Sequence, residues 1–173
     1  MKISKSPHNL LSMSSAKELL LEASAIADVR KSAEESFASG FYCAECVVSA
    51  IAKTQGIRFD FLPKTASAFC NGMTPTYKTC GALTGAIMGV GLLLSRSTVQ
   101  DSVHTSYIAA QQLIRDFEKE FGNRDCKMLL GGCDLNTPEG KIIFKRENLA
   151  RRCMLFTGRA AELAARVLLK NNC

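Results

Sequence analysis

The stretch "TYKTCGALTGAIMGVGLLLS", residues 76–95, is the part of the sequence that decides the fold. Cys80 stands near its start, and Gly81, Gly85 and Gly89 follow at intervals of four residues. Glycine weakens a helix interior by ~1 kcal/mol relative to alanine, so this regular spacing needs a physical reason. We interpret the glycines as a smooth helix face that a second helix or a cofactor approaches closely, and we favour helix packing. This face would hold Cys80 at the end of a rigid, buried helix.

The rest of the chain is a succession of helical patterns that mostly end at glycines. These patterns cover residues 16–38, 42–54, 63–69, 98–121, 123–130 and 147–170. The segment "KIIFK" at 141–145 is too short to carry a sheet. We therefore predict an all-α fold, a single-domain bundle of about five to six helices, with cysteines converging near helix N-termini. Residues 1–13 are expected to form a flexible tail, and residues 14–173 the helical domain.

The composition is that of an ordinary globular chain, with 47% hydrophobic and 22% charged residues. The N-terminal sequence "MKISKSPHNLLSMSSAKELL" lacks the apolar core of a secretion signal. The apolar run that follows Cys80 is shorter than the ~20 residues needed to cross a membrane. We therefore expect a cytoplasmic protein without a membrane span. The net charge of +6 is spread along a chain without tryptophan or a nucleic-acid-binding motif, so no nucleic-acid partner is expected.

Cysteine is the outlier of the composition. Eight of the 173 residues are cysteines, a smaller share than the ~8–10% that is typical of a disulfide scaffold. A cytoplasmic chain keeps its thiols reduced, so the pattern indicates metal binding or redox chemistry. Some of the cysteines could instead be small core residues. The eight are Cys43, Cys46, Cys70, Cys80, Cys126, Cys133, Cys153 and Cys173.

Several of these cysteines fall at the starts of predicted helices. Cys43 and Cys46 form "CAEC" at the start of the second helix, Cys80 begins the glycine-rich helix, and Cys126 follows the predicted cap Asn123. Unpaired N–H groups and the helix dipole at such positions stabilise a thiolate. Because the thiolate is the form that attacks disulfides and binds metals, we expect these cysteines to be reactive.

The motifs around these cysteines resemble a known family. "CGALTG" matches the CGAxxG core of the C_GCAxxG_C_C family of redox-active cysteine proteins, and "YCAECVVSAI", "DCKMLLG" and "RRCMLFTGRAAELAARVL" resemble its other cysteine segments. The similarity covers residues 37–168. It implies that Cys43, Cys80, Cys126 and Cys153 form a redox-active quartet that could hold a metal, and that residues 14–173 are a redox-active cysteine domain.

The chain also departs from the family pattern. Cys46 and Cys70 replace residues that are usually small, and Cys133 and Cys173 are further additions. Cys46 and Cys70 are candidates for cofactor binding, although resolving or packing roles stay open. No C-x-x-C-H motif is present, which excludes covalently attached haem. Residues 1–36 lie outside the resemblance and could serve a homodimer.

Three functional hypotheses stay open at this point. The first is an iron–sulfur cluster or another metal ion on the quartet, which would pass electrons to an unidentified redox partner protein or small substrate. Zinc in the same site would make it structural. The second hypothesis is metal-free dithiol exchange, within "CAEC" or between Cys43 and Cys80. The third is a non-enzymatic helical interaction protein with packed cysteines, which the apolar seam around Cys153 favours. We lean to the first hypothesis and leave open whether the protein is an enzyme, a possible oxidoreductase.

Overall fold

The computed structural model describes residues 13–171, and within this range it contains helices and no strands. The all-α prediction is therefore confirmed. The helices are α1 (Met13–Ala38), α2 (Cys43–Thr54), α3 (Leu62–Ala66), the 3-10 helix η1 (Ser67–Phe69), α4 (Cys70–Met73), α5 (Gly81–Leu94), α6 (His104–Phe121), α7 (Cys126–Leu129), α8 (Pro138–Arg146) and α9 (Ala150–Lys170). The structure has more helices than the five to six expected. Three of them, α3, α4 and α7, are only four or five residues long, and such short helices leave little periodic pattern in a sequence.

Helices α8 and α6 differ most from the sequence prediction. Helix α8 lies where no helix was predicted, and it begins with a cap in which the Thr137 hydroxyl accepts from the N–H of Gly140, followed by Pro138. Helix α6 begins at His104, because Asp101 accepts from the N–H groups of two residues in the preceding turn instead of capping the helix. The predicted tail lies outside the described residues except for Met13. A single domain over residues 14–173 stays a prediction.

The glycine face of α5 packs directly on α2. A Cβ atom added to Gly85 would lie 2.6 Å from the carbonyl oxygen of Ala44, and one added to Gly89 would lie 2.3 Å from Cδ1 of Ile51. The contact at Gly85 is with backbone, which cannot move aside, so only glycine permits this approach of the two helices there, whereas at Gly89 the buried Ile51 side chain would have to shift. The helix-packing interpretation is confirmed at these two positions.

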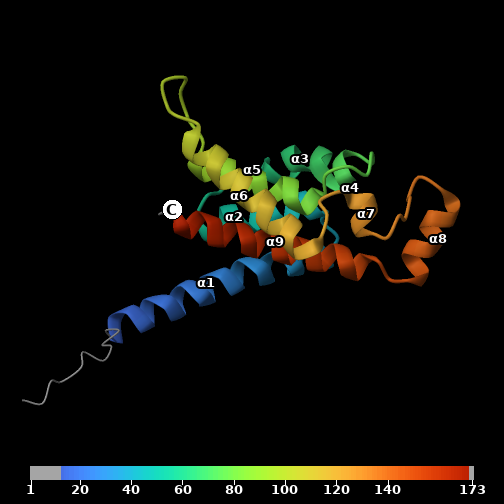
Figure 1. Ribbon diagram of the computed structural model, residues 1–173, viewed down its shortest axis with the longest axis horizontal. Helices are drawn as coiled ribbons and strands as arrows, with labels where there is room; N and C mark the ends of the chain where they lie inside the picture. The colour runs from blue at the N-terminus through green and yellow to red at the C-terminus, as the bar shows by residue number, and fades with distance from the viewer. Residues whose placement is uncertain (1–12, 172–173) are drawn as a thin grey trace, which may run out of the picture.

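Helix α9 is the central element and packs on α1, α2, α5 and α6. Figure 1 shows α9 running through the middle of the bundle, with α1 along one side and α8 standing away from the other helices. The predicted apolar seam is buried at all but one position, Cys153, which is half-buried. The seam comprises Leu149, Cys153, Phe156, Ala160, Leu163 and Val167.

The first half of α1 extends beyond the other helices (Figure 1). Its leucines Leu19, Leu20 and Leu21 are 61–72% exposed, whereas Val29 and Ala33 further along are buried against the bundle. The second half of α1 therefore anchors the helix.

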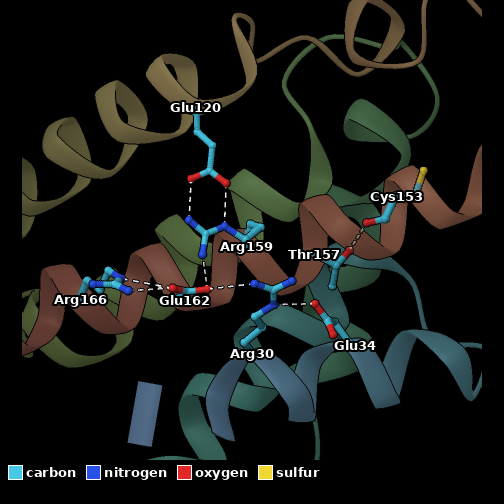
Figure 2. A network of polar contacts seen from close by, with 8 residues as sticks. All are labelled: Arg30, Glu34, Glu120, Cys153, Thr157, Arg159, Glu162 and Arg166. Carbon is cyan, nitrogen blue, oxygen red and sulfur yellow. Dashed lines mark hydrogen bonds and ion pairs between the residues drawn. The ribbon is translucent and has the colours of Figure 1, made fainter. Parts of the chain in front are cut away.

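A network of charged groups ties α1, α6 and α9 together (Figure 2). The Glu162 carboxylate accepts from Arg166 at 2.9 Å, from Arg30 of α1 at 3.3 Å, and from Arg159. Arg159 also makes two hydrogen bonds to Glu120 of α6, at 2.6 and 2.8 Å. Burial alone would raise the pKa of Glu162, but the guanidinium groups of Arg166 and Arg159 outweigh it and hold this pKa below its usual value. Glu162 is therefore the ionised centre of the network.

Replacing Glu162 by glutamine is expected to lower the free energy of unfolding by ~2 kcal/mol at pH 7, because three guanidinium groups lose a carboxylate that is only 10% exposed. The folded-state pKa is below the unfolded value of 4.5, so this stabilisation is present above that pH and is lost as the pH falls through the folded value. Urea denaturation at pH 7 and pH 4 measures both effects.

The matched control is Glu35→Gln on α1. Glu35 forms an ion pair with Lys31, and the side chains of Lys31 and Glu35 are 74% and 67% exposed. An exposed pair contributes ~0–1 kcal/mol, so this variant should unfold like the wild type. Equal losses in the two variants would contradict the assignment of Glu162 as the centre of the network.

Candidate functional site

Four of the cysteines line one cavity of about 370 Å³. Cys43 is the first residue of α2, Cys80 is the N-cap of α5, Cys126 is the first residue of α7, and Cys153 lies in the first turn of α9. The structure thus brings the four sequence-predicted site residues together from four helix starts. The rest of the wall is mostly apolar and includes Phe37, Tyr42, Tyr77, Leu129, Leu130, Leu135, Phe144 and Phe156.

Cys80 and Cys126 are held side by side by backbone hydrogen bonds. The N–H of Cys80 donates to the carbonyl of Arg124 at 2.8 Å, and the N–H of Cys126 donates to the carbonyl of Lys78 at 2.7 Å. These bonds flank an isolated antiparallel bridge between the residues that precede the two cysteines. Two helix starts that are 46 positions apart in the numbering are thereby fixed against each other.

A left-handed turn forms another part of the wall. Residues 71–74 all have φ between 51° and 63°, although only Gly72 among them is glycine. The N–H of Thr74 donates to the carbonyl of Cys70 at 2.8 Å and closes the turn. Left-handed backbone costs an ordinary L-residue roughly 1–2 kcal/mol, so this strained turn has to be held by its surroundings. It places Asn71 in the cavity wall, and no motif in the sequence indicated this residue.

Gly81 makes room for a cysteine of the cavity. A Cβ atom on Gly81 would lie 2.4 Å from the Cys43 sulfur and 3.0 Å from the Cα of Cys70. Glycine here lets the Cys43 side chain lie against the start of α5. Gly81 therefore makes room for the Cys43 side chain, whereas Gly85 and Gly89 make room for helix α2.

Cys153 combines a packing role with a place at the cavity. Its carbonyl accepts from the Thr157 hydroxyl at 2.8 Å, within α9 (Figure 2). Its side chain is half-buried and lines the cavity with the other three thiols. The apolar seam alone does not account for this cysteine.

The additional cysteines among the described residues do not line the cavity. Cys46 and Cys70 are 1% and 2% exposed and do not belong to the cavity wall. Cys133 is buried before α8, where its thiol donates to the carbonyl of Gly140 at 3.2 Å. Cys173 lies outside the described residues. Of the two candidates for cofactor binding, Cys46 and Cys70, neither reaches the cavity in this conformation.

The expectation that helix starts favour thiolates was made for Cys43, Cys46, Cys80 and Cys126, and it is wrong for the last three, whose pKa values are raised. Burial, together with a smaller effect of the neighbouring thiols, raises the pKa of Cys80, Cys126 and Cys153 to about 12 each. The N–H groups of Ala82 and Leu83 do lower the pKa of Cys80, but desolvation outweighs them. These three thiols are neutral at pH 7, so any cation that binds them has to displace protons.

The orientation of the thiols limits what they can bind directly. Within residues 13–171, no three side chains of cysteine, histidine, aspartate or glutamate lie close enough to one another to hold a metal ion. A cysteine side chain can nevertheless turn between staggered positions about one bond. Chemically, four thiols in an apolar cavity can ligate soft metals or exchange with disulfides.

Together, these features define a helical protein built around a four-thiol cavity. Residues 41–167 match the family model C_GCAxxG_C_C, which is described as a putative redox-active protein, and the chain belongs to this family. No curated protein and no solved structure matches the chain significantly. None of the helices in the described part of the chain is long and apolar enough to cross a membrane.

Proposed function

We propose that Cys43, Cys80, Cys126 and Cys153 form one redox site, which binds an iron–sulfur cluster or another metal ion and transfers electrons to a partner protein or a small substrate. The observation that carries this proposal is that all four thiols line one cavity. Four cysteine thiolates are the usual ligand set of such clusters.

The surroundings of the thiols support this proposal. Cys43, Cys80 and Cys153 lie at the starts of helices of 12, 14 and 21 residues, where the N-terminal N–H groups would partly offset negative charge on ligated thiolates, although burial outweighs this effect on the pKa of the free Cys80 thiol. Arg152 lowers the pKa of Cys153, although burial dominates there. Other cations near the cysteines in sequence are engaged elsewhere: Arg124 pairs with Glu118, and Lys127 with Asp134. The helix ends and Arg152 thus supply the positive charge that a ligated site needs.

Loading such a site requires the thiols to turn toward one another and to release their protons. The raised pKa values of Cys80, Cys126 and Cys153 mean that protons compete with the metal at neutral pH. Metal uptake should therefore become tighter as the pH rises from 6 to 8. The apolar wall would limit access of water to a bound cluster.

A metal-free dithiol oxidoreductase is the second candidate. It is favoured by the absence of a preassembled ligand group among the described residues. It is also favoured by Cys43, which is half-buried at the cavity and thus reachable by a small substrate. The two candidate functions can be distinguished because only the first requires bound metal.

The test is the metal and acid-labile sulfide content of protein purified without oxygen. We expect bound metal in the wild type and in Cys133→Ser, whose cysteine lies outside the cavity. The metal content should fall to background in Cys80→Ser and in Cys126→Ser. A wild type without metal, together with unchanged thiol reactivity in the two cavity variants, would overturn the proposal.

A further inference from the structure

The buried thiol of Cys70 lies next to Cys43. The Cys43 sulfur and the Cα of Cys70 are both within 3.0 Å of one point, the position that a Cβ on Gly81 would occupy. A hydrogen bond with the Cys43 thiol is the largest of the influences that raise the pKa of Cys70, ahead of burial. Cys43 also packs against the buried cluster that contains Cys70, so the two residues are neighbours although 27 positions separate them in the numbering.

The two thiols differ in access. Cys43 is half-buried and lines the cavity, whereas Cys70 is 2% exposed and lies behind it. A small molecule in the cavity can reach the sulfur of Cys43 but not that of Cys70. An accessible thiol backed by a buried one is the arrangement in which the first attacks a disulfide and the second resolves the product.

We propose that Cys43 and Cys70 are a reversible dithiol pair, with Cys43 as the attacking thiol, Cys70 as the resolving thiol, and a small dialkyl disulfide in the cavity as the oxidant. The thiolate of Cys43 attacks one sulfur of the substrate, so that a mixed disulfide forms and the first substrate thiol leaves. The thiolate of Cys70 then attacks the Cys43 sulfur, the Cys43–Cys70 disulfide forms, and the second substrate thiol leaves. The pair loses two electrons and two protons, and the substrate disulfide is reduced to two thiols.

This pair needs no metal, so it is independent of the proposed metal site, and it rests on the second candidate function, the dithiol oxidoreductase. The pair and the metal site are nevertheless connected through Cys43, which is also one of the four cavity thiols. Oxidation of the pair would remove one of the four ligands from the site. The dithiol pair would therefore decide whether the cavity can hold a four-thiolate centre.

Cys46 is the competing partner that the experiment must exclude. It lies one helical turn from Cys43 on α2, is 1% exposed, and is near enough to Cys70 for the two thiols to influence each other. Tryptic digestion leaves Cys43 and Cys46 on one peptide, residues 32–53, and Cys70 on another, residues 65–78. A linked pair of peptides therefore has to be assigned with variants.

The experiment treats the full chain, purified without oxygen, with 2-hydroxyethyl disulfide before and after removal of metal by a chelator. We expect peptides 32–53 and 65–78 to be linked in the wild type, in Cys46→Ala and in the control Cys133→Ser. The link should be absent in Cys43→Ser. In Cys70→Ser, the second step is blocked, so a hydroxyethylthio adduct should accumulate on Cys43. Cys70→Ala replaces Cys70→Ser if the serine variant does not fold.

Three outcomes would overturn the proposal. These are a link that persists in Cys43→Ser, a wild type that retains the adduct without forming the link, and a Cys70 variant without the adduct. Metal content separates this proposal from the proposed function. The Cys70 variant should keep any bound metal, and Cys80→Ser should keep the link after losing the metal.

Discussion

Replacing Gly85 by leucine is expected to lower the free energy of unfolding by ~3 kcal/mol. Even a single added Cβ atom would lie 2.6 Å from the Ala44 carbonyl oxygen and 2.7 Å from its Cα, and backbone cannot move aside as a flexible side chain can. The larger side chain has to push α2 away from α5, which overpacks the centre of the bundle. Urea denaturation followed by circular dichroism measures the loss.

The matched control is Gly91→Ala, two residues beyond Gly89 on the same helix. The nearest atom to its added Cβ is the Ser95 hydroxyl oxygen at 3.7 Å, an ordinary contact. This variant should be stabilised by ~0.5–1 kcal/mol, because alanine is the better helix former. If Gly85→Leu unfolded at the same urea concentration as the wild type, α5 and α2 would not pack as described.

Raising the pH from 9 to 12 is expected to destabilise the protein through its buried thiols. The pKa of Cys80 is 9.0 without burial and about 12 in the folded state. Between these values the unfolded chain releases the proton that the folded chain keeps. The contribution of the neutral Cys80 thiol to the free energy of unfolding is fully present below pH 9 and declines above it by about 1.4 kcal/mol per pH unit. The total loss by pH 12 is roughly 4 kcal/mol for this thiol alone. Cys126 and Cys153 act in the same direction.

The measurement is the free energy of unfolding of reduced, metal-free protein at half-unit steps from pH 8 to pH 11. Tyrosines and lysines also titrate in this range, so the wild type is compared with Cys80→Ala. The free energy of unfolding should fall more steeply with pH in the wild type than in Cys80→Ala. The difference in slope should correspond to the release of about one more proton per chain on unfolding. Parallel curves for the two proteins would show that Cys80 is not desolvated as the structure indicates.

Most of the helices could be predicted from the sequence because they depend on local patterns, and the four cavity cysteines could be predicted from local patterns together with a family resemblance. Apolar spacing and glycine stops identified α2, α5 and α9 to within a few residues. Proximity to these helix starts, together with the resemblance to a family, singled out the four cysteines that line the cavity. Helix α8 was not predicted, although Thr137 and Pro138 are typical of a helix start, because the segment KIIFK was considered only as a strand and is too short to carry a sheet.

Other properties of the site depend on neighbours that are remote in the sequence. The left-handed turn at residues 71–74 includes Met73 and Thr74, which carry no preference for such backbone. The raised pKa of Cys80 results from burial among α5 and its partners, which outweighs the local helix dipole. The contact of Cys43 with Cys70 needs the space that Gly81 leaves.

The sequence by itself determined the helical class, the close-packing face of α5 and the placement of Cys43, Cys80 and Cys126 at helix starts, since each follows from residues within a few positions of one another. Only the tertiary structure decided that four thiols share a cavity, that three of them are neutral at pH 7, and that Cys70 backs Cys43. The physical reason is desolvation and close approach. Both depend on which distant segments exclude water from a side chain, and that is settled only when α2, α5, α7 and α9 pack together.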